Sequence, residues 1–440
     1  MSGNDEQRTA ARERFVPEVR RAMAAANFDI AAWPPDWETA GEIDYLYRPG
    51  ILLTPESDAG RVAESLRDAP AVERHARRRG WEPAADTPVS GIARVRFPVA
   101  QAHHTVAALE HVEQQLGSDV ATHEHVFEVT PWVHCPATEP EVALTPQDAA
   151  DPQSVTDALW PPRSTGTAGE GVHISVVDTG LLKGVAGWAP WLADVSADSA
   201  ADIENPDTWN VAKNKPGSDG YADPYAAHGS FIAGVIRCVA PASTVVVERI
   251  LGPSGFVSET DMIRQIWQGL SRSPDIINLS AGGYTRNDAA PLALRHLWRD
   301  RLSQQGGVVL VAAAGNNGSS RPFWPAAFDW CVGVGSMSRD GQHRSWFSNY
   351  GSWVDVYAPG ENLVNAYARL PYRTIVKGAK RDTSAGLAKW SGTSFATPVV
   401  AALIAARMSR TGENGRVAAE ALLAAARGQF RPGVGPRLFP

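Results

Sequence analysis

The sequence predicts an α/β protein in which helices cover both faces of a doubly wound, mostly parallel sheet, with a small α+β domain preceding this fold. Two observations predict the main fold: its strands are continuous, β-branched apolar runs, and helical stretches separate them along the chain. Strands buried on both faces have this pattern, because helices pack against both sides of a parallel sheet. A third observation, an aperiodic segment near residue 150, predicts the boundary between the two domains.

That segment, residues 137–170, is rich in proline, aspartate, threonine and glycine and has little hydrophobic periodicity, which is typical of a connection. It divides the 440 residues into two parts. We expect an N-terminal helical extension at 1–39, a small α+β domain at 40–136, a linker at 137–152 and the main domain at 153–440.

Strands and helices of the small domain are predicted in the order β-α-β-α-β, at 42–54, 56–69, 90–99, 102–117 and 119–132. In the main domain we predict strands at 171–177, 243–251, 275–280, 307–314 and 331–337, and helices at 229–239, 258–271 and 289–305. Ligands of open parallel sheets bind beyond the carboxyl ends of the strands. The residues that follow each strand are therefore the candidate functional residues.

Composition and charge exclude several classes of protein. The balance of 41 basic and 48 acidic residues gives a net charge of -7, which argues against a nucleic-acid partner. Three scattered cysteines predict neither a disulfide framework nor a zinc site. No apolar run approaches the roughly 18 residues that cross a bilayer, and no secretory signal is visible, so we expect a cytoplasmic protein without a membrane partner.

Four polar residues stand after predicted strands or at the starts of apolar helices: Asp178, His228, Asn316 and Ser394. Each has a structural explanation when it is taken alone. Asp178 and Asn316 fit turns, and His228 fits a hydrogen-bonded structural histidine. Ser394 fits a helix cap, but one cap does not explain why a glycine and three hydroxyl residues lead into a helix that is apolar on every side.

Together, an aspartate, a histidine and a serine in an α/β domain are the parts of a nucleophilic acyl-transfer site. The imidazole accepts the serine proton, and a buried carboxylate fixes the tautomer of the imidazole and stabilises its positive charge. The start of the Ser394 helix offers unpaired N–H groups and a positive dipole end where an oxyanion develops.

Five segments, in this order, resemble the successive motifs of the subtilisin-like serine proteases (subtilases): VVDTG, HGSFIAG, NLSAGG, VAAAGNNG and SGTSFATP. The resemblance extends over about residues 155–425. It implies that Asp178 orients His228, that His228 is the general base and then the acid, and that Ser394 is the nucleophile.

The same resemblance implies that the Asn316 side-chain amide and the backbone N–H of Ser394 bind the oxyanion. It further implies that Ser280, Ala281 and Gly282 pair with the substrate as an added strand, and that Ala313, Ala314 and Gly315 form the other wall of the specificity pocket. Small residues on both walls favour a cleft that admits sizeable apolar side chains.

Three features depart from many family members. The helix after the histidine motif runs through without the insertion that carries a calcium-binding loop, so we expect no metal and no cofactor. The segment 181–227 is long and acidic; it is either a cation site or, as we expect, a solvated loop. The segment 368–390 carries five basic residues beyond Arg369 and forms either a rim over the cleft that influences substrate choice or a surface loop.

The small domain is similar in size, position and element order to the inhibitory propeptide of many subtilisin-like proteases, although no residue motif supports the match. The alternatives are a substrate-recruiting or a partner-binding module. Five histidines of this part make a metal site geometrically conceivable, but without clear ligand spacing we expect solvated side chains; they are His103, His104, His111, His123 and His125.

These observations predict a serine endopeptidase that acts on protein or peptide substrates, with an N-terminal domain that inhibits it within the same chain or assists its folding. The alternative is a catalytically silent binding protein with the subtilisin fold. A nucleotide-dependent enzyme is disfavoured, because no predicted strand is followed by a phosphate-binding glycine motif.

Overall fold

The computed structural model describes residues 3–72, 83–128, 137–143, 166–206, 220–223, 225–252, 254–375 and 378–440. A seven-stranded parallel sheet forms the centre of the main domain, in the order β16-β15-β14-β13-β7-β11-β9. Its strands are β7 (His173–Asp178), β9 (Ser196–Ala197), β11 (Thr244–Arg249), β13 (Ile276–Leu279), β14 (Val309–Ala313), β15 (Cys331–Met337) and β16 (Val356–Pro359). The five strands predicted for this domain are confirmed.

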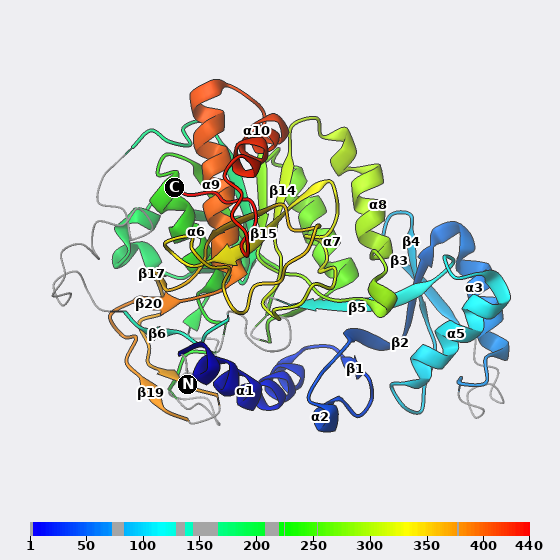
Figure 1. Ribbon diagram of the computed structural model, residues 1–440. Helices are drawn as coiled ribbons and strands as arrows, with labels where there is room; N and C mark the ends of the chain where they lie inside the picture. The colour runs from blue at the N-terminus through cyan, green and yellow to red at the C-terminus, as the bar shows by residue number, and fades with distance from the viewer. Residues whose placement is uncertain are drawn as a thin grey trace.

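Helices cover both faces of this sheet, as predicted (Figure 1). One face carries α6 (His228–Val239), α9 (Thr393–Thr411) and α10 (Gly415–Arg427), and the other carries α7 (Glu259–Leu270) and α8 (Leu292–Asp300). Helix α9 is buried on all sides over its first half because it packs against α6 and the sheet. None of the helices in the described ranges is long and apolar enough to span a membrane.

The small domain is an antiparallel sheet with helices on one face. Its strands are β1 (Ala31–Trp33), β2 (Tyr45–Pro55), β3 (Ala84–Val89), β4 (Ile92–Arg96) and β5 (Thr122–Glu128), and its helices are α3 (Ala59–Asp68) and α5 (His104–Leu116). The five predicted elements are present as β2, α3, β4, α5 and β5, but an additional strand, β3, lies between α3 and β4, so the observed order is β-α-β-β-α-β. Strand β3 was missed because four of its six residues are exposed and it has no apolar alternation.

The N-terminal extension contains the helices α1 (Gly3–Ala25) and α2 (Trp37–Ala40). Strand β1 also lies before residue 40 and pairs with β2, so the sheet of the small domain begins earlier than the sequence boundary at 40. Helix α1 packs its apolar face against the main domain: Phe15 and Val19 share a buried cluster with Phe256 and Phe323.

A shared sheet joins the two domains. Strand β12 (Phe256–Ser258) of the main domain pairs antiparallel with β5, so the sheet of the small domain has the order β12-β5-β2-β4-β3. Figure 1 shows β5 extending from the small domain toward the main domain.

Residues 137–143, which the sequence places in a linker, contain another strand. Strand β6 (Glu141–Val142) pairs antiparallel with β20 (Leu387–Trp390), which also pairs with β17 (Leu363–Ala366). The chain therefore contacts the main domain on both sides of the residues between 128 and 137.

Candidate active site

Asp178 and His228 form a buried pair. Asp178 is the last residue of β7 and His228 is the first residue of α6, and both side chains are completely buried. His228 Nδ1 lies 2.8 Å from Asp178 Oδ1, which also accepts a hydrogen bond of 2.7 Å from the backbone N–H of Thr179. A carboxylate accepts hydrogen bonds, so Nδ1 carries the proton, and Nε2 is the basic nitrogen of the neutral imidazole.

Nε2 of His228 has no hydrogen-bond partner among the described residues, although it is buried. A buried nitrogen without a partner is unfavourable for stability, so a functional explanation is needed. A general base requires such a nitrogen to receive a proton from a nucleophile.

Three hydrogen bonds hold the start of α6 against the segment after Asp178. The backbone N–H of Gly229 donates to Thr179 Oγ1 at 3.0 Å, and the N–H of Leu182 donates to Ser230 Oγ at 2.7 Å. Gly229 has no room for a side chain, because a Cβ there would lie 2.7 Å from the carbonyl oxygen of Gly180. The glycine after the histidine therefore allows the helix to approach the segment that follows Asp178 closely.

Glu204 accepts the third hydrogen bond that holds the start of α6. The sequence did not indicate this residue as part of the site. Glu204 Oε2 accepts a bond of 2.9 Å from the N–H of Ala227, which precedes His228 and has a left-handed φ of 62°. Burial raises the pKa of Glu204 well above its usual value. The expected solvated acidic loop at 181–227 is wrong for Glu204 and Asp202, because both are buried in the described part of that segment.

Ser394 is the second residue of α9 and is 1% exposed. Its Oγ lies 3.5 Å from the carbonyl oxygen of Ser280, and Ser280 Oγ donates to the carbonyl oxygen of Ser394 at 2.8 Å. The ring of the next residue, Phe395, lies 5.3 Å from the ring of His228. Packing thus places the start of α9 next to both the histidine and the predicted substrate edge.

Asn316 follows β14 and is completely buried. Its Oδ1 accepts two bonds of 2.8 Å from Thr393, one from the backbone N–H and one from the hydroxyl. These bonds fix the orientation of the amide, and Nδ2 is left without a partner among the described residues. A fixed, buried N–H donor beside the start of a helix is suited to binding a developing oxyanion.

We expect Asn316→Ala to lower kcat by about a hundredfold, or about 3 kcal/mol, with little change in KM, because the lost donor acts mainly in the transition state. Steady-state kinetics with a peptide substrate checks this. A loss below about threefold would show that another group binds the oxyanion. Asn317→Ala, at the next position, is a suitable control.

The predicted substrate edge is occupied by the small domain. Gly282 exchanges two backbone hydrogen bonds of 2.9 Å with Glu128, the last residue of β5. Phe127 packs against the same edge, because a Cβ on Gly283 would lie 2.6 Å from its ring. Ser280 and Ala281, the other two predicted residues of this edge, are also buried.

The other predicted wall, Ala313 to Gly315, lies beside Asn316 and is buried. Gly315 has a φ of 93°, and its N–H donates to Thr393 Oγ1 at 3.2 Å. Thr393 therefore joins this wall to Asn316 and to the start of α9. In the sequence, Thr393 is only one of three hydroxyl residues before an apolar helix, and no local pattern indicates this role.

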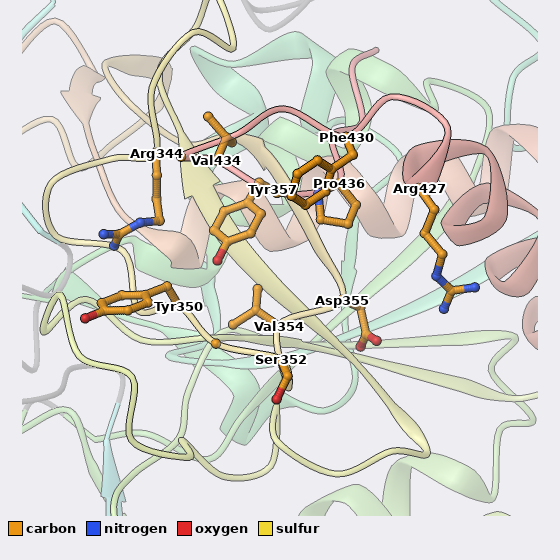
Figure 2. A pocket seen from close by; sticks show the side chains of 13 residues that line it. Arg344, Tyr350, Ser352, Val354, Asp355, Tyr357, Arg427, Phe430, Val434 and Pro436 are labelled. Atoms are coloured by element: carbon orange, nitrogen blue, oxygen red, sulfur yellow. The ribbon is translucent and has the colours of Figure 1, made fainter.

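A pocket of about 560 Å³ lies elsewhere, between the loop before β16 and the C-terminal segment (Figure 2). Tyr350, Tyr357 and Phe430 line it with Arg344 and Arg427. None of the predicted site residues lines this pocket.

The small-domain histidines differ from the prediction. His123 and His125 are buried rather than solvated, and they lie in the sheet beside Tyr45 and Tyr47. No group of three or more metal-binding side chains occurs within the described ranges.

Comparisons with known proteins show the family of this chain. The sequence model of the Subtilase family matches residues 169–429. The chain is 30% identical over 278 residues to a thermophilic serine proteinase of Bacillus sp. (strain AK1), a match that covers 60% of this chain and 64% of that protein. It is also 30% identical over 264 residues to thermitase of Thermoactinomyces vulgaris, covering 57% of this chain and 81% of thermitase.

Among solved structures, fervidolysin from Fervidobacterium pennivorans, described as a keratinolytic enzyme related to subtilisin, matches with a TM-score of 0.55 and 15% identity. The match covers 89% of this chain and 60% of fervidolysin. At this identity the similarity supports the fold, and its extent includes much of the N-terminal part as well as the main domain.

Proposed function

Because the chain belongs to the subtilase family, we propose that it is a serine endopeptidase that hydrolyses peptide bonds through Ser394, His228 and Asp178. The observation that carries the proposal is the buried Asp178–His228 hydrogen bond, which leaves Nε2 of His228 available as a base. This arrangement fixes the tautomer and the orientation of the imidazole, so that Nε2 is the nitrogen that accepts a proton.

In the first step, Ser394 Oγ attacks the carbonyl carbon of the substrate and its proton passes to His228 Nε2. Asp178 stabilises the resulting imidazolium, while Asn316 Nδ2 and the N–H of Ser394 bind the oxyanion. His228 then donates the proton to the leaving amine, and the C–N bond breaks to give an acyl-enzyme. Water, activated by the same imidazole, hydrolyses the ester and regenerates Ser394.

A fluorophosphonate probe tests this proposal against a silent binding protein. The serine proposed here attacks phosphorus with loss of fluoride, so the folded protein should be labelled at Ser394. Heat-denatured protein should not be labelled, since the reaction requires the assembled site. Absence of labelling in the folded Phe127→Asp variant, in which the cleft is expected to open, would favour the silent protein.

We further propose that the small domain inhibits the peptidase within the same chain. The pairing of Glu128 with Gly282 supports this, because it uses the backbone groups that an extended substrate would need. Strand β5 also pairs with β12. The end of β5 therefore lies between two segments of the main domain, β12 and the segment that contains Gly282.

Buried polar and ionisable groups connect the two domains at this interface. Glu124 of β5 is completely buried and bonds with Arg48 at 3.1 Å and with the hydroxyl of Thr260 in the main domain. His125 lies 3.4 Å from Glu259, which is also buried. Removing one partner of such a network leaves an uncompensated buried group, so the network favours one docked arrangement.

Helix α1 adds a contact close to the catalytic histidine. Tyr225, three residues before His228, donates its hydroxyl to Glu18 Oε1 at 3.0 Å. The N-terminal region thus contacts both the substrate edge and the turn that precedes His228.

The docked small domain should be less stable at acidic pH. His123 is completely buried with no hydrogen-bond partner among the described residues, and burial lowers its pKa, with a smaller contribution from the charges of His125 and Arg286. Its pKa rises to about 6.5 on unfolding, so unfolding takes up a proton. The contribution of neutral His123 to the free energy of unfolding is therefore fully present above about pH 6.5 and is lost progressively as the pH falls below that value.

We therefore expect the free energy of unfolding of the Ser394→Ala chain to fall between pH 7.5 and pH 5. His123→Phe should reduce this dependence, because phenylalanine fills the apolar site without titrating. Urea titrations at both pH values measure the effect. An equal pH dependence in the two proteins would show that His123 does not contribute.

A further inference from the structure

Residues 137–143 bind in extended form beside the nucleophile. Strand β6 pairs with β20, with Glu141 opposite Lys389. The N–H of Thr138 donates to the carbonyl oxygen of Ser391 at 3.4 Å, and the N–H of Ser391 donates to Thr138 Oγ1 at 3.2 Å. Ser391 is three residues before Ser394. Figure 1 shows β6, β20 and β17 side by side.

The side chain of Glu139 has specific donors in the segment 368–390. Its Oε1 accepts bonds from the hydroxyl of Tyr372 at 2.9 Å and from the N–H of Ile375 at 2.8 Å. Arg381 Nη1 donates to the carbonyl oxygens of Glu139 and Pro140 at 3.1 and 2.8 Å. The segment thus binds both the acidic side chain and the backbone beside it.

A second acidic residue of this segment forms an ion pair with a lysine. Glu141 Oε2 lies 2.8 Å from Lys389 Nζ, and both side chains are partly exposed. This pair adds charge complementarity, although it is exposed enough to contribute less than the contacts of Glu139.

The direction of the chain identifies which side of the scissile bond these residues occupy. Glu128 pairs with Gly282, two residues after Ser280, whereas Thr138, later in the chain, bonds with Ser391, three residues before Ser394. An extended substrate that runs in the same direction has its acyl part at Gly282 and its leaving part at Ser391.

Trp390 connects this region to the catalytic site. Its Nε1 donates to the carbonyl oxygen of Thr138 at 2.6 Å, and its ring meets the ring of His228 edge-on at 5.7 Å. Trp390 is completely buried. A strand bound at β20 is therefore held by a side chain that packs directly against the proposed general base.

We propose that Tyr372, Ile375, Arg381, Lys389 and Trp390 form a binding site for an extended acidic peptide segment on the leaving-group side of the scissile bond. In this structure the chain's own residues 138–142 occupy the site. The inference rests on the proposed peptidase function and adds a substrate class: protein segments with a glutamate a short distance after the cleaved bond. Of the two interpretations of 368–390, a rim over the cleft or a surface loop, this proposal adopts the rim and gives it a ligand.

The test uses the full chain and pairs of fluorogenic peptides that differ by Glu or Gln at one of the five positions after the cleaved bond. The chain's own segment competes equally with both peptides of a pair. The ratio of their kcat/KM values therefore measures how strongly the site prefers glutamate to glutamine. We expect Glu to be favoured about tenfold at one position, as for a hydrogen-bonded charged group. Tyr372→Phe should reduce that ratio to about threefold or less, because one of two donors is lost.

Tyr350→Phe, at a partly exposed tyrosine of the pocket that none of the proposed peptide-binding residues lines, is the matched control and should leave the ratio unchanged. Equal rates for all pairs, or a preference that survives in Tyr372→Phe, would overturn the inference.

Occupancy by the chain's own segment gives an independent readout. Fluorophosphonate labelling of Ser394 should be faster in Glu139→Gln than in wild type, and an added peptide of sequence ATEPEVA should slow it more than ATQPEVA. If labelling occurs but neither effect appears, this inference fails while the proposed function stands. If no protein is labelled, including Phe127→Asp, the proposed function itself fails.

Discussion

Replacing Ser394 with alanine is expected to abolish peptide hydrolysis and leave the fold intact. Loss of a catalytic serine lowers kcat by about a millionfold in proteases of this type. The hydroxyl contributes little packing, and its contact with the carbonyl oxygen of Ser280 is long, at 3.5 Å. Steady-state kinetics and circular dichroism measure the two parts of the prediction.

Ser409→Ala is the matched control, since Ser409 lies on the same helix, more than three turns beyond Ser394, and bonds with the N–H of Gly169. It should retain wild-type activity. Turnover by Ser394→Ala above the background of a parallel mock purification would refute Ser394 as the nucleophile.

Phe127→Asp is expected to raise peptidase activity at least about tenfold by releasing the small domain from the cleft. Phe127 is completely buried, pairs with Val257 across the strands β5 and β12, and shares a buried cluster with Leu53 and Met262. An unpaired carboxylate at this site costs several kcal/mol, which is comparable to the binding energy of a docked strand. Hydrolysis of a small peptide measures access to the cleft.

Two further measurements make the result decisive. Ala85→Asp places the same charge on the exposed strand β3 of the small domain and should leave activity unchanged. Circular dichroism and limited proteolysis report whether the main domain of Phe127→Asp remains folded. A folded variant with wild-type activity would show that the domain does not inhibit, and substrate recruitment would become the better explanation.

The parts of the site that the sequence predicted are those fixed by local structure. Asp178 and His228 stand at the end of a strand and at the start of a helix, where the parallel fold brings catalytic residues together. Continuous apolar runs identified β7, β13 and β14 for the same reason. The roles proposed for these residues come from the family resemblance.

Other features depend on contacts between segments that are distant in the sequence, and no local pattern carries them. Glu204 is one of many acidic residues in a polar segment, and only the fold shows that it bonds with Ala227. His123 lies between polar residues in the sequence, a pattern that predicts an exposed side chain. In the fold, however, its ring packs against two tyrosines of β2. The pairing of β6 with β20 joins residues about 250 positions apart, which is why the sequence indicated only a linker.

The central claim is that Ser394 forms an acyl-enzyme, and trapping that intermediate tests it most directly. The protein is incubated with an activated ester whose acyl group deacylates slowly, quenched in acid, digested and analysed by mass spectrometry. Phe127→Asp is used beside wild type, so that a closed cleft does not prevent acylation. We predict one acyl group per chain on the peptide that contains Ser394, and none in His228→Ala, which lacks the base. Ester hydrolysis without an adduct, or an adduct on another residue, would contradict the account.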